Sequence, residues 1–296
     1  MEKHTSVLLT EAVDALAIKT HGVYVDATLG AHGHGEKIIE RLGAHGTYIG
    51  IDADPEAVRI ASEELHGEAT IKLVTGNFRD IDSIVEQEGI EMVDGILADL
   101  GWRMEQFSGN GKGFSFLTDE PLVMTYGNRE DYGFTAHDIV NTWDEENIVS
   151  ILQGYGEERF ARRIARGIID ARSTGTIDTT FALTRIIEAS VPGGYRHGKI
   201  NPSTRTFQAL RITVNDELGV LDTFLRKAFT LLSVGGRLAV ITFHSLEDRM
   251  VKHTFKQFAH DSLGTLVTKK PITPTREEMN NNRRARSAKL RIFEKA

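Results

Sequence analysis

The stretch GVYVDATLGAHGHGEKIIERLGAHGTYIGID, residues 22–52, decides the fold. It begins with a short apolar run, GVYVDAT, passes through a glycine-rich turn into the helical pattern EKIIERL, and ends in a second apolar run, TYIGID. Two apolar runs separated by a helix at this spacing predict parallel strands joined by a crossover helix. The chain therefore begins as an α/β fold of the doubly wound, Rossmann-like class.

The same alternation continues to residue 100 and returns near the C-terminus. Further helix and strand patterns are PEAVRIASEEL (55–65), IKLVTGNF (71–78), VDGILADL (93–100) and, after an amphipathic stretch at 207–232, RLAVITF (237–243). Between 107 and 204 the pattern changes to glycine-rich loops and helical periodicity. We predict one sheet domain, residues 1–106 and 205–296, interrupted by a mainly helical domain at 107–204.

Composition limits the kinds of protein this can be. A chain of 296 residues that is 40% hydrophobic can bury a substantial core, and the absence of cysteine excludes disulfide bonds, thiolate metal sites and a cysteine nucleophile. The N-terminus has the pattern of neither a signal peptide nor a membrane span, so we expect a cytoplasmic protein. The net charge of -7 argues against a surface that binds nucleic acid everywhere. Residues 269–296 nevertheless carry nine Lys and Arg against three Glu.

A ligand crevice is predicted at the carboxyl ends of the first strands, where open parallel sheets bind ligands. Glycines in the turn at 26–35 allow the backbone to bend tightly and approach a ligand. Asp52 ends the second strand and could accept hydrogen bonds from ribose hydroxyls, or serve as a helix cap. Phe78 could lie against an adenine ring or fill the core, and Asp99 ends the fourth strand. Such acidic surroundings favour a cationic sulfonium nucleoside over a dinucleotide.

Motifs along nearly the whole chain resemble the MraW family, also called RsmH, the cytosine-N4 methyltransferases of small-subunit ribosomal RNA. They are HTSVLLTEAV (4–13), DATLGAHGHG (26–35), GIDADPEA (50–57), DLG (99–101), GKGFSF (111–116), YGEERFARRIAR (155–166), NPSTRTFQALRITVNDEL (201–218), FHSLEDRMVK (243–252) and ARSAKLR (285–291). The resemblance implies S-adenosyl-L-methionine as cofactor and a cytidine of 16S rRNA, in the decoding region, as substrate. It also implies that the inserted domain recognises the substrate, and it leaves open naked RNA or assembled subunit.

Transferred by position, the family's cofactor contacts fall on seven residues: His32, Gly33, His34, Asp52, Phe78, Asp99 and Gln106. The sequence departs from the family in three places. It reads DLGWRM (99–104) where the family has DLGVSS, PLVMTYG (121–127) where the family has PLDMRM, and His-Gly-His in the turn where the family has Gly-Gly-His. The first two lie near the expected mouth of the site and affect substrate entry.

The predicted catalytic residues are Asp99, Trp102 and His244. A cytosine amine is a poor nucleophile, so the enzyme must orient it against the sulfonium methyl, and Asp99 with the backbone of 100–102 could accept its hydrogens. Trp102 is either a platform for base stacking or a core residue. His244 follows the strand at 237–243, where it could accept a proton or cap the next helix. No metal is predicted.

Arginines in three places are predicted to contact RNA phosphates, since the target base must be unstacked and its strand held. The helical pattern at 159–166 carries arginines on one face and apolar residues on another, although such a face can also be merely solvated. The predicted RNA-binding residues are Arg162, Arg166, Arg205, Arg211, Arg283, Arg284 and Arg286. The partner would be small-subunit ribosomal RNA or the assembled subunit, with no membrane and with a homodimer possible.

Three alternatives remain on sequence alone. The chain could methylate another amine or a hydroxyl, or it could be a non-catalytic RNA-binding assembly factor on a methyltransferase scaffold. A nicotinamide dehydrogenase fits less well because the glycine spacing differs from the dinucleotide fingerprint. Stabilisation of the fold by S-adenosylmethionine but not by NAD distinguishes these classes.

Overall fold

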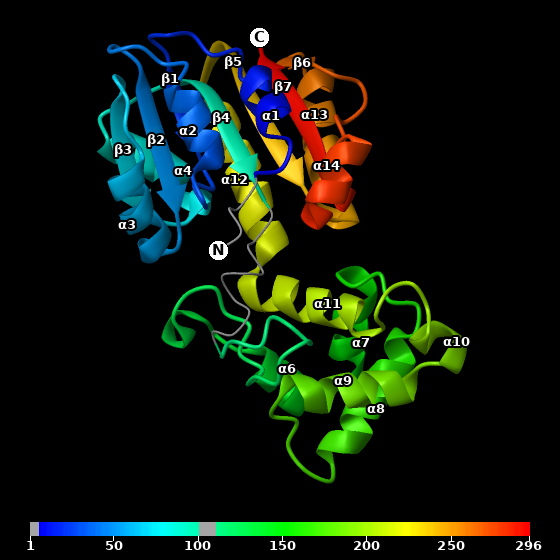
Figure 1. The fold of residues 1–296 in the computed structure, drawn as a ribbon. Coiled ribbons are helices and arrows are strands. Elements are labelled where there is room, and N and C mark those ends of the chain that lie inside the picture. Colours follow the sequence, from blue (N-terminus) through cyan, green and yellow to red (C-terminus); the bar gives the residue numbers. More distant parts are fainter. Residues whose placement is uncertain (1–5, 101–110) are drawn as a thin grey trace. The chain divides into compact units, whose positions relative to one another are not determined.

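The computed structural model describes residues 6–100 and 111–296. The chain folds as two compact units, Met1–Gly101 with Leu218–Ala296 and Trp102–Glu217. Figure 1 shows the first as an α/β unit and the second as a group of helices. The doubly wound class with a helical insertion, predicted from the alternation of strand and helix patterns, is confirmed.

A seven-stranded sheet organises the first unit, in the order β3-β2-β1-β4-β5-β7-β6. Its strands are β1 (Val23–Asp26), β2 (Thr47–Asp52), β3 (Thr70–Thr75), β4 (Val93–Asp99), β5 (Leu232–Thr242), β6 (Gly264–Leu266) and β7 (Lys289–Lys295). Strands β1 to β5 run parallel, and β7 pairs antiparallel with both β5 and β6. Strand order reverses between β1 and β4, and such a reversal is where doubly wound sheets bind ligands.

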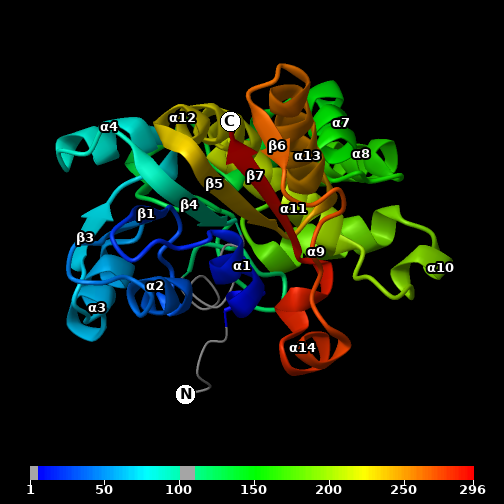
Figure 2. The same cartoon turned by 90° about the horizontal axis from the view of Figure 1, so that it is seen from above.

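Helices cover both faces of this sheet. Figure 2 shows α1 (Leu9–Ala15), α2 (Gly33–Ile39) and α3 (Pro55–Glu64) on one face, and α4 (Ile81–Gln87), α12 (Glu217–Leu231) and α13 (Ser245–His260) on the other. The short helices η1 (Phe78–Asp80), α14 (Arg276–Asn281) and η3 (Arg283–Ser287) complete the unit. Helix α3 begins where the sequence favours it, with Pro55 in the first turn and the Asp54 side chain accepting from the Glu56 N–H at 3.0 Å.

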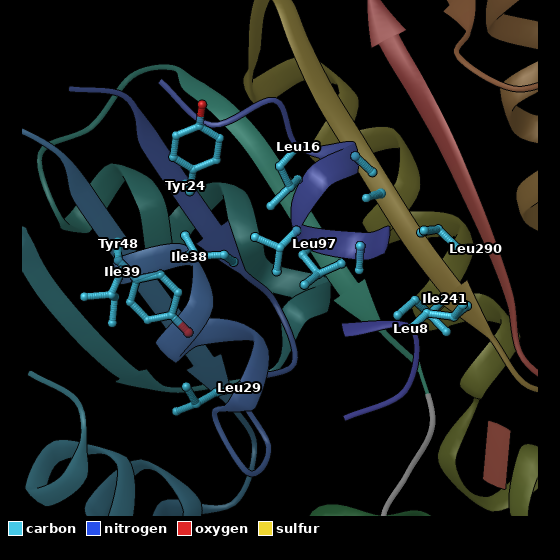
Figure 3. Packing of buried hydrophobic residues seen from close by; sticks show 14 of the residues in the cluster. Leu8, Leu16, Tyr24, Leu29, Ile38, Ile39, Tyr48, Leu97, Ile241 and Leu290 are labelled. Carbon is cyan, nitrogen blue, oxygen red and sulfur yellow. The ribbon is translucent and has the colours of Figure 1, made fainter. Parts of the chain in front are cut away.

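The core on the α1 and α2 side of the sheet holds two fully buried tyrosines on adjacent strands. Tyr24 of β1 and Tyr48 of β2 pack with aliphatic residues such as Leu16, Ile38 and Leu97. Their hydroxyls point toward opposite ends of the sheet (Figure 3). The Tyr24 hydroxyl accepts from the main-chain N–H of Lys19, near the amino end of β1, whereas the Tyr48 hydroxyl lies at the carboxyl end.

Gly35 makes room for the Tyr48 hydroxyl under helix α2. A methyl group at residue 35 would overlap this hydroxyl, and Tyr48 cannot move aside because its side chain is fully buried. Glycine to alanine inside a helix ordinarily stabilises by roughly 1 kcal/mol. Here we expect Gly35→Ala to destabilise the first unit by about 2 kcal/mol, because the added carbon overpacks the core.

Urea unfolding followed by circular dichroism measures the effect of Gly35→Ala. The matched control is Gly43→Ala, just beyond α2, where the added carbon meets the Thr20 carbonyl at an ordinary 3.5 Å. A Gly35→Ala protein as stable as the Gly43→Ala control would show that the glycine is not required by the tyrosine.

The second unit is helical in the part that the structure describes. Its helices are η2 (Arg129–Asp131), α6 (Ala136–Thr142), α7 (Glu145–Gly154), α8 (Ala161–Arg172), α9 (Thr180–Ser190), α10 (Gly193–Arg196) and α11 (Ser203–Asn215). The sequence places the return to the sheet domain at residue 205. In the structure, α11 instead packs Phe207, Leu210 and Val214 into the core of the second unit, and the chain re-enters the first unit with α12. Within residues 6–100 and 111–296, no helix is long and apolar enough to cross a membrane.

Candidate active site

The turn after β1 is tied to the end of β2. The main-chain N–H of Leu29 donates to the Ile51 carbonyl, and that of Gly30 donates to the Asp52 carboxylate, each at 2.8 Å. The other Asp52 oxygen accepts from the Asp54 N–H at 2.9 Å. Gly30 has a φ of 52°, in the left-handed region that glycine adopts without strain. The Asp52 carboxylate is therefore fixed in orientation by two main-chain donors.

The same turn is also tied to β4. The Ala27 N–H donates to the Leu97 carbonyl at 2.8 Å, and the Thr28 hydroxyl oxygen accepts from the Asp99 N–H at 2.7 Å. One residue further, the Leu100 N–H donates to the Ile241 carbonyl of β5 at 3.0 Å. A single turn thus connects the carboxyl ends of β1, β2 and β4, and it positions the backbone that carries Asp99.

Three neighbouring strands end in an aspartate at this edge of the sheet: Asp26 on β1, Asp52 on β2 and Asp99 on β4. Carboxyl groups attract a sulfonium and an ammonium group, whereas they repel the pyrophosphate of a dinucleotide. The residues present therefore fit S-adenosylmethionine as the ligand.

His32, Gly33 and His34 form the beginning of α2, as expected for the family's cofactor turn. His32 precedes the helix with a φ of 49°, and its Nε2 lies 3.0 Å from a Glu64 carboxylate oxygen. The buried His34 ring bonds the Val7 carbonyl through Nε2 at 3.1 Å. A side-chain carbon at Gly33 would overlap the Ser6 hydroxyl. Gly33 and His34 thus hold the N-terminal segment against α2.

Phe78 follows β3 and is nearly buried. Its ring packs edge-on against Phe224 of α12, with ring centroids 5.1 Å apart. The structure therefore gives this aromatic a packing contact, the role that the sequence left open beside adenine stacking. Trp102 and Gln106 lie outside the described residues.

His244 begins helix α13 as its N-cap. Its Nδ1 accepts from the Glu247 N–H at 3.4 Å, and the Glu247 carboxylate accepts in return from the main-chain N–H of His244 at 3.2 Å and of Phe243 at 2.9 Å. This reciprocal arrangement is a capping box, which satisfies donors left over at a helix start. Of the two roles that the sequence left open, capping is thus present in the geometry.

We expect His244→Ala to lower the free energy of unfolding by about 1 kcal/mol, because the Glu247 N–H loses its acceptor. His244→Asn should be about as stable as the wild type, since asparagine is a favoured N-cap. If capping is the role of His244, this variant should also keep most of the wild-type rate of methyl transfer. Thermal unfolding and transfer of labelled methyl measure the two effects. Normal stability with lost transfer in His244→Asn would instead assign proton acceptance to the histidine.

The predicted RNA-binding arginines differ in their surroundings. Arg211 donates twice to the nearly buried Glu217 carboxylate, at 2.7 and 3.0 Å, and Tyr126 donates to the same group at 2.6 Å, which favours a structural role. Arg205 donates to the Glu157 carbonyl at 3.3 Å. Arg166 lies 3.3 Å from Glu145 and is exposed, and three further predicted arginines are exposed as well: Arg162, Arg283 and Arg286. Arg284 is half-buried in η3.

Sequence reasoning assigned no role to Asp26, Thr28 or Tyr48, although all three belong to the network at this edge. Asp26 and Thr28 belong to the glycine-rich motif at 26–35, so this motif could have indicated their place near the site. Tyr48 lies in an apolar run, where a tyrosine is expected to pack in the core. Only the pairing of β1 with β2 brings its hydroxyl to Asp26.

Comparison with known proteins gives matches over the whole chain. Residues 1–296 match the model of the MraW methylase family. The chain is 41% identical to the ribosomal RNA small subunit methyltransferase H of Clostridioides difficile, over 99% of this chain and 98% of that protein. It is 43% identical to the protein of the same name from Clostridium botulinum, strain Loch Maree, over 99% of each chain. The corresponding protein of Halothermothrix orenii is 42% identical, over 100% of this chain and 99% of that one.

Proposed function

Because the chain belongs to the MraW methylase family, we propose that it transfers a methyl group from S-adenosylmethionine to the exocyclic N4 of a cytidine in 16S rRNA. The observation that carries the proposal is the set of aspartates ending β1, β2 and β4 around one turn. Its relatives act, by name, on ribosomal RNA of the small subunit, so the reaction belongs in the cytoplasm, where ribosomes are.

S-adenosylmethionine supplies an electrophilic methyl group on a sulfonium, which leaves as a neutral thioether. Asp52, fixed by the Gly30 and Asp54 N–H groups, would hold the ribose of this donor. Asp99 would accept a hydrogen bond from the cytosine amine and so orient the nitrogen lone pair toward the methyl group. The amine gains a methyl group and then loses one proton to solvent, and Asp99 would stabilise the positive charge that develops on nitrogen before the proton leaves.

A basic stripe on α8 supports an RNA substrate. Residues 159–205 carry nine Lys and Arg against three Asp and Glu, in a chain whose net charge is -7. Arg162, Arg163 and Arg166 of α8, with Arg159 just before the helix, recur at helical spacing and are all exposed, while Ile164 and Ile168 of the same helix are buried. Exposed guanidinium groups on one face neutralise phosphates without burying charge.

We expect the double replacement of Arg162 and Arg163 by alanine to weaken binding to small-subunit RNA about tenfold at low salt. The slope of log affinity against log salt should become shallower by roughly 1 to 2. Each phosphate contact that is lost leaves fewer counterions to be released when the RNA binds. Donor binding should stay unchanged. The matched control replaces Arg59 and Arg226, two exposed arginines of the first unit. Equal losses in both double variants would contradict a specific role for the α8 stripe.

The test of the proposed function is transfer of labelled methyl to small ribosomal subunits that lack the modification. Digestion to nucleosides and mass spectrometry then identify the product. N4-methylcytidine is the expected result. If the label appears in another nucleoside, the substrate is a different amine or a hydroxyl. If the donor binds but no methyl is transferred to RNA or subunits, the result favours a non-catalytic assembly factor.

A further inference from the structure

A buried carboxyl group lies at the centre of the turn network. Asp26, the last residue of β1, is 1% exposed. One of its oxygens accepts from the Thr28 N–H at 3.2 Å, and the other accepts from the Tyr48 hydroxyl at 3.3 Å. The Thr28 hydroxyl oxygen in turn accepts from the Asp99 N–H. Asp26 is thus linked to β2 through Tyr48 and to the backbone of Asp99 through Thr28.

The tyrosine in this network is held as firmly as the carboxyl group. Tyr48 is fully buried in the core, and its hydroxyl passes under α2 at the position where Gly35 has no side chain. Figure 3 shows the ring between β2 and α2 with the hydroxyl toward the carboxyl end of the strands. Movement of either group therefore displaces the other, and with it the turn that carries Thr28.

The surroundings make ionisation of Asp26 costly. Burial raises the pKa of Asp26 from 3.8 to about 7, and the negative charge of Asp52 on β2 acts in the same direction. The hydrogen bonds from Thr28 and Tyr48 oppose this shift. Among the described residues, the titratable groups at this edge also include Asp99 on β4, His32 and His34 at the start of α2, and Glu64, which pairs with His32.

We propose that Asp26 is a positioning residue that releases a proton to solvent when the cationic methyl donor binds. The inference rests on the donor of the proposed function. A positive charge entering a crevice of low dielectric constant favours the ionised carboxyl group, and linkage requires that ionisation favour the cation equally. Once ionised, Asp26 accepts stronger, charge-assisted hydrogen bonds from Thr28 and Tyr48. Donor binding then tightens the turn that positions Asp99.

Titration calorimetry of S-adenosylmethionine in buffers of different ionisation enthalpy counts the protons released, and it requires no catalysis. With an apo pKa near 7 for Asp26, the wild type should release nearly one proton per donor at pH 6, about half at pH 7 and about a tenth at pH 8. Donor affinity should fall about fivefold between pH 7 and pH 6. A role limited to packing would move neither quantity.

Two variants locate the released proton. Asp26→Asn keeps the shape of the side chain but cannot titrate, so its release should vanish. Tyr48→Phe removes a donor to the ionised form, so its release should persist and move to higher pH. The matched control is Tyr24→Phe, a fully buried tyrosine on β1 whose hydroxyl bonds Lys19 at the opposite end of the sheet, and its release should equal that of the wild type.

The outcomes separate this inference from the function on which it rests. Binding to the wild type without proton release overturns the inference alone. Unchanged release in Asp26→Asn also overturns it, because the proton then comes from another group. If Asp26→Asn does not fold, the wild-type proton count and the Tyr48→Phe shift still decide. Failure of the wild type to bind the donor overturns the proposed donor, and this inference with it.

Discussion

Asp99→Ala is expected to lower the rate of methyl transfer roughly a thousandfold, while the first unit remains folded. Asp99 ends β4 at the edge where β1 and β2 also end in aspartates, and its main-chain N–H is held by the Thr28 hydroxyl at 2.7 Å. A group held in place before the reaction costs no reorganisation at the transition state, and removing one such group typically costs about 10² to 10³ in rate. The measurement is single-turnover transfer of labelled methyl to subunits that lack the modification.

Two further variants make the Asp99 result interpretable. Asp99→Asn keeps the volume and an accepting oxygen but loses the charge, so a smaller loss than in Asp99→Ala would assign part of the effect to hydrogen bonding. Asp94→Ala is the matched control, because Asp94 lies at the other end of the same strand and bonds Lys19 and the Val23 N–H. If Asp99→Ala transfers methyl as fast as Asp94→Ala does, Asp99 is not a catalytic residue.

The sheet could be predicted from the sequence because parallel strands buried on both faces appear as short apolar runs. VYVD, TYIGID and VDGILAD are such runs, and they form β1, β2 and β4. The C-terminal edge could not be predicted in the same way. KLRIFEK alternates polar and apolar residues in a segment that reads as a basic tail, yet it forms β7 with Leu290 and Ile292 buried.

The basic residues of that segment show why charge in a sequence does not predict which cations are free to bind RNA. Lys289 and Arg291 bond the Asp248 carboxylate of α13, at 2.9 and 2.7 Å, and Arg291 is nearly buried. These contacts hold the pKa of Asp248 below its usual value, against the opposing effect of burial. A run of cations in a sequence does not reveal which of them face a carboxylate of a distant helix, because that partner is fixed only by the fold.

The candidate site was predictable to the extent that it depends on strand ends. Asp52 and Asp99 could be located because ligands bind beyond the carboxyl ends of parallel strands. The Asp26 and Tyr48 pair could not, since it requires the pairing of β1 with β2 and the gap left by Gly35. His244 illustrates a different limit, because a residue between a strand and a helix suits a cap and a catalytic role equally well until Glu247 is seen to complete the box.

Asp26 is also expected to make the stability of the first unit depend on pH in a direction opposite to that of most aspartates. Its pKa is 3.8 when unfolded and about 7 in the folded chain. Between these values the folded state holds one proton more than the unfolded state. This contribution to stability is complete below pH 3.8, decreases as the pH rises, and is lost above pH 7. A shift of about 3 units corresponds to roughly 4 kcal/mol in total.

The free energy of unfolding of Asp26→Asn, relative to that of the wild type, should therefore rise by about 3 kcal/mol between pH 5 and pH 8, because asparagine does not titrate and its folding requires no proton uptake. The difference between the two proteins isolates this group from all other titrations. Hydrogen exchange of the β1 and β2 amides, read by mass spectrometry, follows the first unit separately from the second. A constant difference across this range would mean that Asp26 is ionised in the folded chain at low pH, and that Thr28 and Tyr48 offset the cost of its burial.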